Sequence, residues 1–456
     1  MSEDRTLRRE GYAPSNLVVG QRGARTRQKI ITETLRLFES QGFHATSVDG
    51  IAKAAGTSRS TLYQYFESKE QIFVELLEEC GSALIRVARR IGPLGPTRLG
   101  FDNLHWWLGE WAWTYDKYAT MFVQWANVDT PGTAIRPLVN GFVRSYDARI
   151  AERLASSGLQ GMDPLDAATA MSSLVHRFNY FRHMDFVPAR TGEELLDGLA
   201  VVVQLMLFPD TPADVLATVV PSPGRGAGPT RPLPLFTARP AGPAPEWENR
   251  LDGLRPRAAA TVRQIIDAGA TLFADRGYHG TVVDDVVAQA GLARGTFYKY
   301  FDEKLDLLLQ LTHECAEEMK PLVQRFGLID PAEDGLAGLR SWLTDYLPFH
   351  TRYFGVMRAW QEGTSNDPRL LATARRMSAA MLGAALKVLG RVERSHPLDL
   401  EVAATVLGAI LERMPEALHQ QDPGRAPAQN AELMAAVIGR GLLNGGTASW
   451  PAGPPP

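Results

Sequence analysis

Two short strings of the sequence carry side chains that hydrogen-bond readily to nucleic acid. Residues 58–64 read Ser-Arg-Ser-Thr-Leu-Tyr-Gln, and residues 293–299 read Ala-Arg-Gly-Thr-Phe-Tyr-Lys. Their hydroxyl, guanidinium, phenol, amide and ammonium groups can bond base edges or phosphates, and neither string contains an acid. Each string therefore needs a helix that presents it to a DNA groove.

The sequence around the first string predicts two short helices joined by a tight turn. Thr46 is expected to cap a helix that runs to about residue 55, and Gly56 to make the turn. Ser58 or Thr57 then caps a second helix, which ends near residue 66, and a long helix follows over residues 69–90. This pattern predicts a helix-turn-helix, whose second helix enters the major groove.

The whole pattern occurs twice in the chain. Gly42-Phe-His-Ala-Thr corresponds to Gly277-Tyr-His-Gly-Thr, and the same offset of 235 residues relates Lys69 to Lys304 and Cys80 to Cys315. A repeat of this length is a duplicated domain pair and not a short solenoid unit.

Composition bounds the class of protein. The 456 residues are 45% hydrophobic with a net charge of −3, and two cysteines exclude a disulfide scaffold. We expect a cytoplasmic protein, because no stretch reads as a signal peptide or a membrane span. No nucleotide loop, metal constellation or nucleophile with its base is recognisable, so neither an enzyme nor a bound cofactor is predicted.

Apolar residues recur at helical spacing throughout, and no alternating strand pattern is present, which predicts an all-α fold. It comprises two tandem copies of a helix-turn-helix domain followed by a helical-bundle domain. The expected parts are a disordered arm (1–20), the first head (21–90), the first helical domain (97–208), a Pro/Gly-rich linker (209–254), the second head (255–325), the second helical domain (331–444) and a disordered tail (445–456).

The string that begins at Thr61, Thr-Leu-Tyr-Gln-Tyr-Phe-Glu-Ser-Lys-Glu, resembles the N-terminal module of the TetR/AcrR family, and so does the string that begins at Thr296, Thr-Phe-Tyr-Lys-Tyr-Phe-Asp-Glu-Lys. The resemblance covers about fifty residues of each copy. It implies a bacterial regulator, here a repressor, that binds operator DNA near the nucleoid and responds to a small effector.

The candidate DNA-binding residues of the first head are Arg25, Arg27, Thr46, Ser58, Arg59, Ser60, Thr61, Tyr63, Gln64 and Lys69. The resemblance implies that Thr61, Tyr63 and Lys69 bind phosphates and that Arg59, Ser60 and Gln64 face bases. The counterparts in the second head are Thr281, Arg294, Gly295, Thr296, Tyr298, Lys299 and Lys304.

The second head departs from the first in charge and capping. Residues 21–70 hold eight Lys and Arg against five acids, whereas residues 255–304 hold seven against six, so the second head should bind phosphates more weakly. It also lacks the hydroxyl cap of its recognition helix. A solvated helical hairpin without DNA is the alternative interpretation of each head.

Aromatic residues gather in the helical domains, where they serve either as core or as the lining of an effector pocket for a flat or apolar ligand. The candidate pocket residues are Trp107, Trp111, Phe122, Trp125, His176, Tyr180, Trp342, Tyr346 and Trp360. No metal site is predicted there, and Cys80 and Cys315 fit small buried side chains better than a thiol switch.

Family members pair through their last two helices, and the candidates here are 165–185 with 193–208 and 398–414 with 430–443. We hypothesise an intrachain pseudo-dimer that reads two unlike half-sites; a homodimer of chains with four heads is the alternative. The alternative function is a ligand-independent DNA-binding or scaffolding protein whose helical domains serve only pairing.

Overall fold

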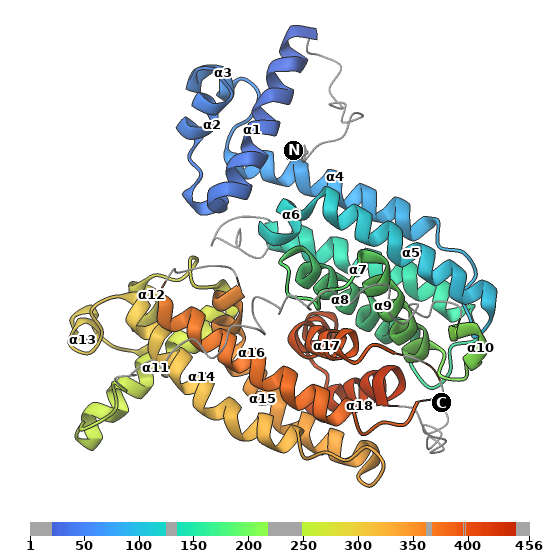
Figure 1. The fold of residues 1–456 in the computed structure, drawn as a ribbon. Helices are drawn as coiled ribbons and strands as arrows, with labels where there is room; N and C mark the ends of the chain where they lie inside the picture. The colour runs from blue at the N-terminus through green and yellow to red at the C-terminus, as the bar shows by residue number, and fades with distance from the viewer. Residues whose placement is uncertain are drawn as a thin grey trace. The chain divides into compact units, whose positions relative to one another are not determined.

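The computed structural model describes residues 21–124, 135–217, 249–361, 367–394, 396 and 398–443. Every regular element in those ranges is a helix, which confirms the predicted all-α architecture (Figure 1). The chain divides into two compact units, residues 1–90 with 110–142 and residues 91–109 with 143–456. Among the helices described, none is long and apolar enough to cross a membrane.

The first unit is built on the first head. Its helices are α1 (Gln21–Ala45), α2 (Val48–Ala54), α3 (Arg59–Tyr63), α4 (Lys69–Arg89) and α6 (Ala119–Gln124), and α5 (Arg98–Lys117) and α7 (Ile135–Ala155) contribute residues to both units. Apolar residues at helical spacing, among them Ile30, Phe38, Ile51, Leu62 and Phe73, are buried together. This core fixes α2 and α3 against α1 and α4.

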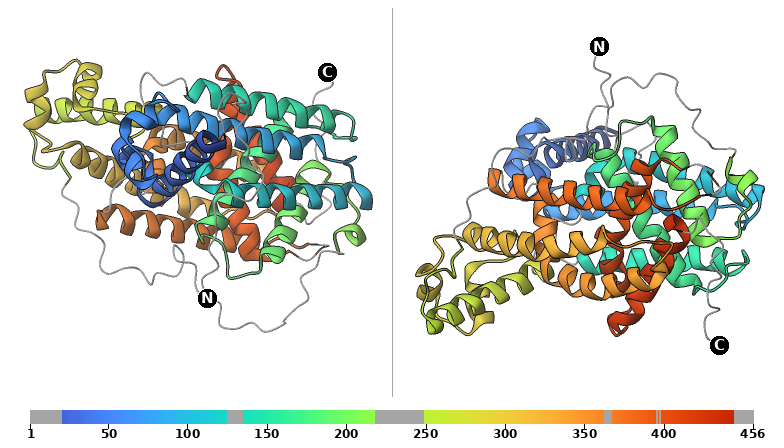
Figure 2. Two further views of the ribbon diagram at one scale, coloured as in Figure 1. Left: turned by 90° about the horizontal axis from the view of Figure 1, so that it is seen from above. Right: turned by 60° about the horizontal axis from the view of Figure 1, so that its bottom comes forward.

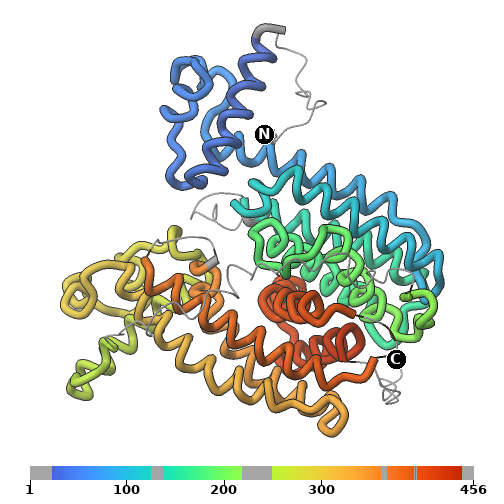
Figure 3. Tube along the Cα trace, in the orientation of Figure 1, coloured from blue at the N-terminus to red at the C-terminus, as the bar shows by residue number. Residues whose placement is uncertain are grey.

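The second unit contains the second head. Its helices α11 (Pro256–Arg276), α12 (Val283–Ala290), α13 (Arg294–Tyr298) and α14 (Lys304–Phe326) repeat the order of α1 to α4 (Figure 3). Further along the chain come α15 (Gly335–Gln361) and α16 (Pro368–Leu389), and α15 packs along α11. One long helix, α15, thus stands where the first copy has two, α5 and α6.

The second unit also brings together helices from both copies. These are α8 (Pro164–His183), α9 (Gly192–Leu207), α17 (Leu400–Gln421) and α18 (Pro427–Ile438), the last followed by a π-helical turn, Gly439–Leu443. Figure 2 shows α17 beside α8, and the turn packs on α9. The four helices therefore pair in one bundle, and they correspond to the helices expected from sequence to pair.

Both ends of the expected linker are packed. A short helix, α10 (Ala213–Leu216), buries Val215 and Leu216 within residues 209–217. At the other end the backbone N–H of Arg250 donates to the Gln310 side chain, 3.0 Å away. The expected arm (1–20), the middle of the linker (218–248) and the tail (445–456) lie outside the described residues.

Candidate nucleic-acid interface

The first head forms its turn as the sequence predicts, with one difference in capping. Gly56 has a φ of 63°, the left-handed conformation that glycine adopts without strain, and the Ser58 hydroxyl caps α3 by accepting from the Thr61 N–H at 3.1 Å. Ser47, and not Thr46, caps α2, because its hydroxyl accepts from the Gly50 N–H at 3.0 Å. The cap lies one residue later than expected.

Thr46 and Thr281 serve the fold of each head. Both are almost fully buried, and their hydroxyls donate to the carbonyls of Gly42 and Gly277 at 2.7 and 2.8 Å. Gly42 interrupts α1 near its end and Gly277 directly follows α11, both with positive φ, so each threonine bonds back to the glycine at which the regular helix breaks. Because these side chains are buried, a contact of Thr46 or Thr281 with DNA stays a prediction, and only the backbone of these residues could make it.

The exposed face of α3 carries a connected set of polar groups. The Ser58 hydroxyl lies 2.8 Å from that of Ser60 and 2.9 Å from that of Thr61. The Arg59 guanidinium lies 5.6 Å from the centre of the Tyr63 ring. Four of the predicted base and phosphate contacts in this head are thus gathered on one short helix before any DNA is bound.

The second head repeats this face without the hydroxyls. Ala293 occupies the capping position of α13 and makes no side-chain bond, and Gly295 has open space where a side chain would stand. Arg294 lies 5.8 Å from the centre of the Tyr298 ring, as its counterpart does in the first head. Lys299 follows Tyr298 and is exposed.

Lys69 and Lys304 make bonds that the sequence did not reveal. The Lys69 Nζ donates to the carbonyls of Phe43 and Thr46 at 2.8 and 2.9 Å and lies 4.4 Å from the centre of the Phe43 ring. Lys304 donates in the same way to the residues that match them in the second head. Burial lowers the pKa of both amines. Each lysine thus joins two parts of its head.

Arg25 and Arg27 have different surroundings. Arg25 is exposed. Arg27 is largely buried, donates to Glu75 at 2.7 Å and lies 4.7 Å from the centre of the Phe66 ring. The Arg27 guanidinium therefore holds α1 to α4, and Arg25 is the better placed of the two for a phosphate.

A protein family described as "Bacterial regulatory proteins, tetR family" matches residues 30–76 and, a second time, residues 265–311. The two matched segments contain α2, α3 and their counterparts α12 and α13 in full. The chain carries two tandem TetR-like modules. The family matches lie within the two heads; for reference, residues 21–208 are called the first module and residues 255–443 the second.

Two curated relatives and one solved structure are similar to parts of this chain. The regulator AcrR of Shigella flexneri is 45% identical over 58 residues, which are 13% of this chain and 27% of AcrR. An HTH-type transcriptional repressor of Mycobacterium tuberculosis is 27% identical over 180 residues, 40% of this chain and 90% of its own length. The solved FadR regulator of Bacillus subtilis with stearoyl-CoA is 19% identical, covering 40% of this chain and 99% of FadR, with a TM-score of 0.30.

The aromatic residues of the first module fall into both units. In the first unit Trp111 and Phe122 are buried with ring centres 5.6 Å apart, and Tyr115 stacks on Phe122 at 4.5 Å. Trp107, His176 and Tyr180 belong to the second unit. Trp125 lies outside the described residues.

In the second module the polar atoms of the aromatic cluster are bonded inside the core. The Trp342 indole donates to the Leu322 carbonyl at 2.8 Å, and the Tyr346 hydroxyl donates to the Leu411 carbonyl at 3.1 Å. The two rings stack with centres 4.7 Å apart. The Trp360 indole donates to the Thr312 hydroxyl at 3.1 Å.

Ion pairs join the paired helices of the two modules, and sequence reasoning missed them. The Arg177 Nε on α8 lies 2.8 Å from the Glu412 carboxylate on α17. Arg190 bonds Asp399 at 2.8 Å, and Arg425 bonds Asp166 at 2.6 Å. The partners stand more than 200 residues apart in sequence, so no local signal could have identified them.

Titratable groups are also buried in the second unit, near this pairing face. Burial raises the pKa of Asp147 to about 6, although Ser172 and Thr169 donate hydrogen bonds to its carboxylate. Burial lowers the pKa of His350 to about 4, and burial together with the positive charge of Arg413 lowers that of His176. Both imidazoles are therefore neutral at pH 7.

Proposed function

We propose that the chain is a sequence-specific DNA-binding regulator that acts as a repressor, and that a small apolar or aromatic effector modulates its binding to the operator. The observation that carries the proposal is the presence of two helix-turn-helix heads with matched geometry. In each head a short helix carries an arginine, a threonine and a tyrosine. One buried apolar residue of that helix, Leu62 or Phe297, fixes it to the core of the head.

We further propose that one chain acts as a pseudo-dimer. The pairing helices of the first module, α8 and α9, pack against α17 and α18 of the second. The ion pairs Arg177–Glu412, Arg190–Asp399 and Arg425–Asp166 cross this face. A pairing face that is already covered within the chain leaves little of it for a second copy, which favours two heads per regulator over four.

Selection of bound sequences from random duplex DNA at one stated salt concentration tests the proposal. We expect an asymmetric motif with two unlike halves. A perfect palindrome would mean that a single kind of head reads DNA in a dimer of chains. The absence of any enriched sequence would contradict DNA reading altogether.

The mass of the complex tests the pseudo-dimer separately. Light scattering after gel filtration should give one chain, 50.1 kDa, for the free protein, and the mass of one chain plus one duplex for the complex with DNA that carries the selected motif. Two chains on one motif with all heads occupied would overturn this part and leave the regulator itself intact.

We propose the buried aromatic cluster of Trp111, Tyr115 and Phe122 as the place where a flat or apolar effector would insert in the first module; packing of the core is the alternative role of these rings. In the second module the bonded polar atoms of Trp342 and Tyr346 favour the alternative, in which the helical domain serves only packing and pairing. A panel of small planar aromatic compounds separates the two. Thermal stabilisation with loss of DNA binding supports an effector, and no shift with any compound supports the alternative.

A further inference from the structure

The first residue of each recognition helix is an arginine, and the two arginines have the same surroundings in their heads. Arg59 lies 3.4 Å from the Asp49 carboxylate and Arg294 lies 3.1 Å from the Asp284 carboxylate. In both heads the aspartate is in the first turn of the preceding helix, ten residues earlier. The guanidiniums of Arg59 and Arg294 therefore occupy equivalent positions on the two heads in the free protein.

The other residues of the two recognition helices also correspond in burial. Leu62 and Phe297 are fully buried at corresponding positions and fix the orientation of α3 and α13. Tyr63 and Tyr298, the next residues, are 44% and 46% exposed. Corresponding exposed side chains of the two helices therefore leave the head in corresponding directions, and differences in what the heads read must come from differences in residue type.

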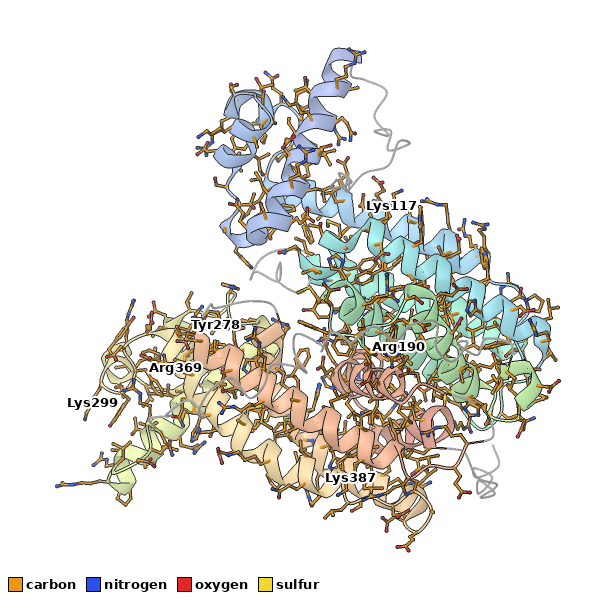
Figure 4. All side chains as sticks on the ribbon, in the orientation of Figure 1. Lys117, Arg190, Tyr278, Lys299, Arg369 and Lys387 are labelled. Carbon is orange, nitrogen blue, oxygen red and sulfur yellow. The ribbon has the colours of Figure 1, made fainter. Side chains whose placement is uncertain are left out.

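Besides the capping position, where Ser58 corresponds to Ala293, two exposed positions differ in chemistry. Gln64 in the first head corresponds to Lys299 in the second, and Ser60 corresponds to Gly295. Figure 4 shows Lys299 at the outer edge of the second head. Its ammonium lies 5.4 Å from the centre of the Tyr300 ring. Among the described residues Lys299 forms no ion pair, so its charge is available to a partner outside the chain.

The side chains at these positions prefer different bases. An amide has one donor and one acceptor, which match N7 and the N6 amino group of adenine, whereas an ammonium has donors only and matches O6 and N7 of guanine. Arginine in both heads matches guanine by two parallel hydrogen bonds. Glycine offers no side-chain contact at all.

We propose that the two half-sites share one guanine, read by Arg59 in one half and Arg294 in the other, and differ where Gln64 and Lys299 stand, with adenine in the first half and guanine in the second. The half-site under the second head also loses the preference that Ser60 provides in the first. This inference rests on the proposed function, because it assigns specificity to heads already taken to bind DNA.

Selection from random duplexes tests the inference with the full chain and its exchange variants. Gln64→Lys should replace adenine by guanine at one position of one half, and Lys299→Gln should make the opposite change in the other half. Each should alter the relative affinity for the two bases by about tenfold or more. Both side chains are exposed, so the variants should fold as the parent chain does. Ser60→Gly is the matched control, and it should flatten the preference at its own position only.

The outcomes separate the inference from the function beneath it. Enrichment of the parental motif by both exchange variants would overturn the inference and leave DNA reading intact. So would a Lys299→Gln variant that binds every sequence more weakly and loses about one unit of salt dependence, because that result marks a phosphate contact. Failure of the parent chain to enrich any sequence would instead remove the proposed function.

Discussion

Lys69 and Lys304 occupy corresponding places in the two heads and make corresponding bonds. Each ammonium lies over an aromatic ring and donates to two carbonyls of the turn after the first helix. Hydrogen bonds from a charged donor are among the stronger ones in a folded protein. The lysines therefore hold that turn in place, whether or not they also approach a phosphate.

Replacing Lys69 by Met should loosen the first head in the absence of DNA. We expect its unfolding free energy to fall by about 1–3 kcal/mol, because the carbonyls of Phe43 and Thr46 lose a charged donor. Hydrogen exchange of the amides between residues 42 and 50 measures the change, and Lys53→Met, at an exposed site of the same head, is the control. Unchanged exchange with weaker DNA binding would show that Lys69 acts only on phosphate.

Asp147 should make stability depend on pH in a direction unusual for a carboxylate. Its pKa, raised to about 6 by burial, exceeds the unfolded value, so the folded state binds the extra proton. The stabilisation that Asp147 contributes to the folded state is full below about pH 4 and is lost as pH rises through about 6. The free energy of unfolding changes by about 3 kcal/mol over this range. His350, whose pKa is lowered to about 4, acts oppositely in the same range.

The Asp147 contribution is isolated by comparing unfolding free energies of the parent chain and Asp147→Asn between pH 4 and 7. At pH 7 the variant should have a larger free energy of unfolding than the parent, and the difference between the two free energies should shrink toward pH 4. His350→Gln should change the slope in the opposite sense. A difference that does not vary with pH would contradict the assignment of a raised pKa to Asp147.

At the scale of the helix, capping distinguishes the two heads more clearly than charge does. The side chain of Ser58 caps the recognition helix α3 by accepting from its third N–H, whereas the side chain of Ala293 makes no such bond before α13 and the Thr296 N–H donates to the Ala293 carbonyl, 2.8 Å away. Both helices have only five residues, so a single cap is a large part of their local stability. The second recognition helix should fray more readily before it meets DNA.

Exchanging the caps should exchange this property. We expect Ser58→Ala to destabilise α3 by about 1 kcal/mol and Ala293→Ser to stabilise α13 by a similar amount, because the hydroxyl oxygen satisfies an N–H of the first turn. Hydrogen exchange at residues 61 and 296 in the free chain reports each effect, and each head serves as the control for the other. Equal exchange in parent and variants would mean that burial of Leu62 and Phe297 fixes the helices without help from a cap.

The parts that were predictable from sequence are those that depend on neighbours in the chain. The turn at Gly56 is local and was predicted, and the local cap of α3 was predicted as either Ser58 or Thr57, of which Ser58 makes the bond. The cap of α2 was misplaced from Ser47 to Thr46, because both have hydroxyls and only the buried contact of Thr46 with Gly42 decides between them. Arg177–Glu412 depends on the packing of distant helices, which no spacing encodes.

At the scale of the whole chain, the two modules hold their heads differently. In the second module Arg352 on α15 bonds Asp267 on α11 at 2.7 Å. Nearby, Gly355 allows the backbones of the two helices to meet: a Cβ there would lie 2.3 Å from the carbonyl carbon of Phe273. The first module has Lys117 and Thr120 at the positions of Arg352 and Gly355. The second head is therefore fastened to its helical domain by contacts that the first cannot make.

Breaking this attachment should affect one head only. Arg352→Leu should speed hydrogen exchange in α11 several-fold and leave α1 unchanged, because Asp267 loses its partner across the helix pair. Lys117→Leu is the matched control in the first module and should change neither helix. Faster exchange in both heads after Arg352→Leu would contradict a contact confined to the second module.

The meeting of α8 and α9 with α17 and α18 inside one polypeptide has a consequence for how occupancy varies with the amount of protein. When pairing helices belong to separate chains, dilution dissociates them and occupancy of a site falls with the square of concentration. Here the linker keeps the partners at a high and constant effective concentration. Operator occupancy should follow the first power of concentration, so that a cell with only a few copies of the chain keeps a graded response.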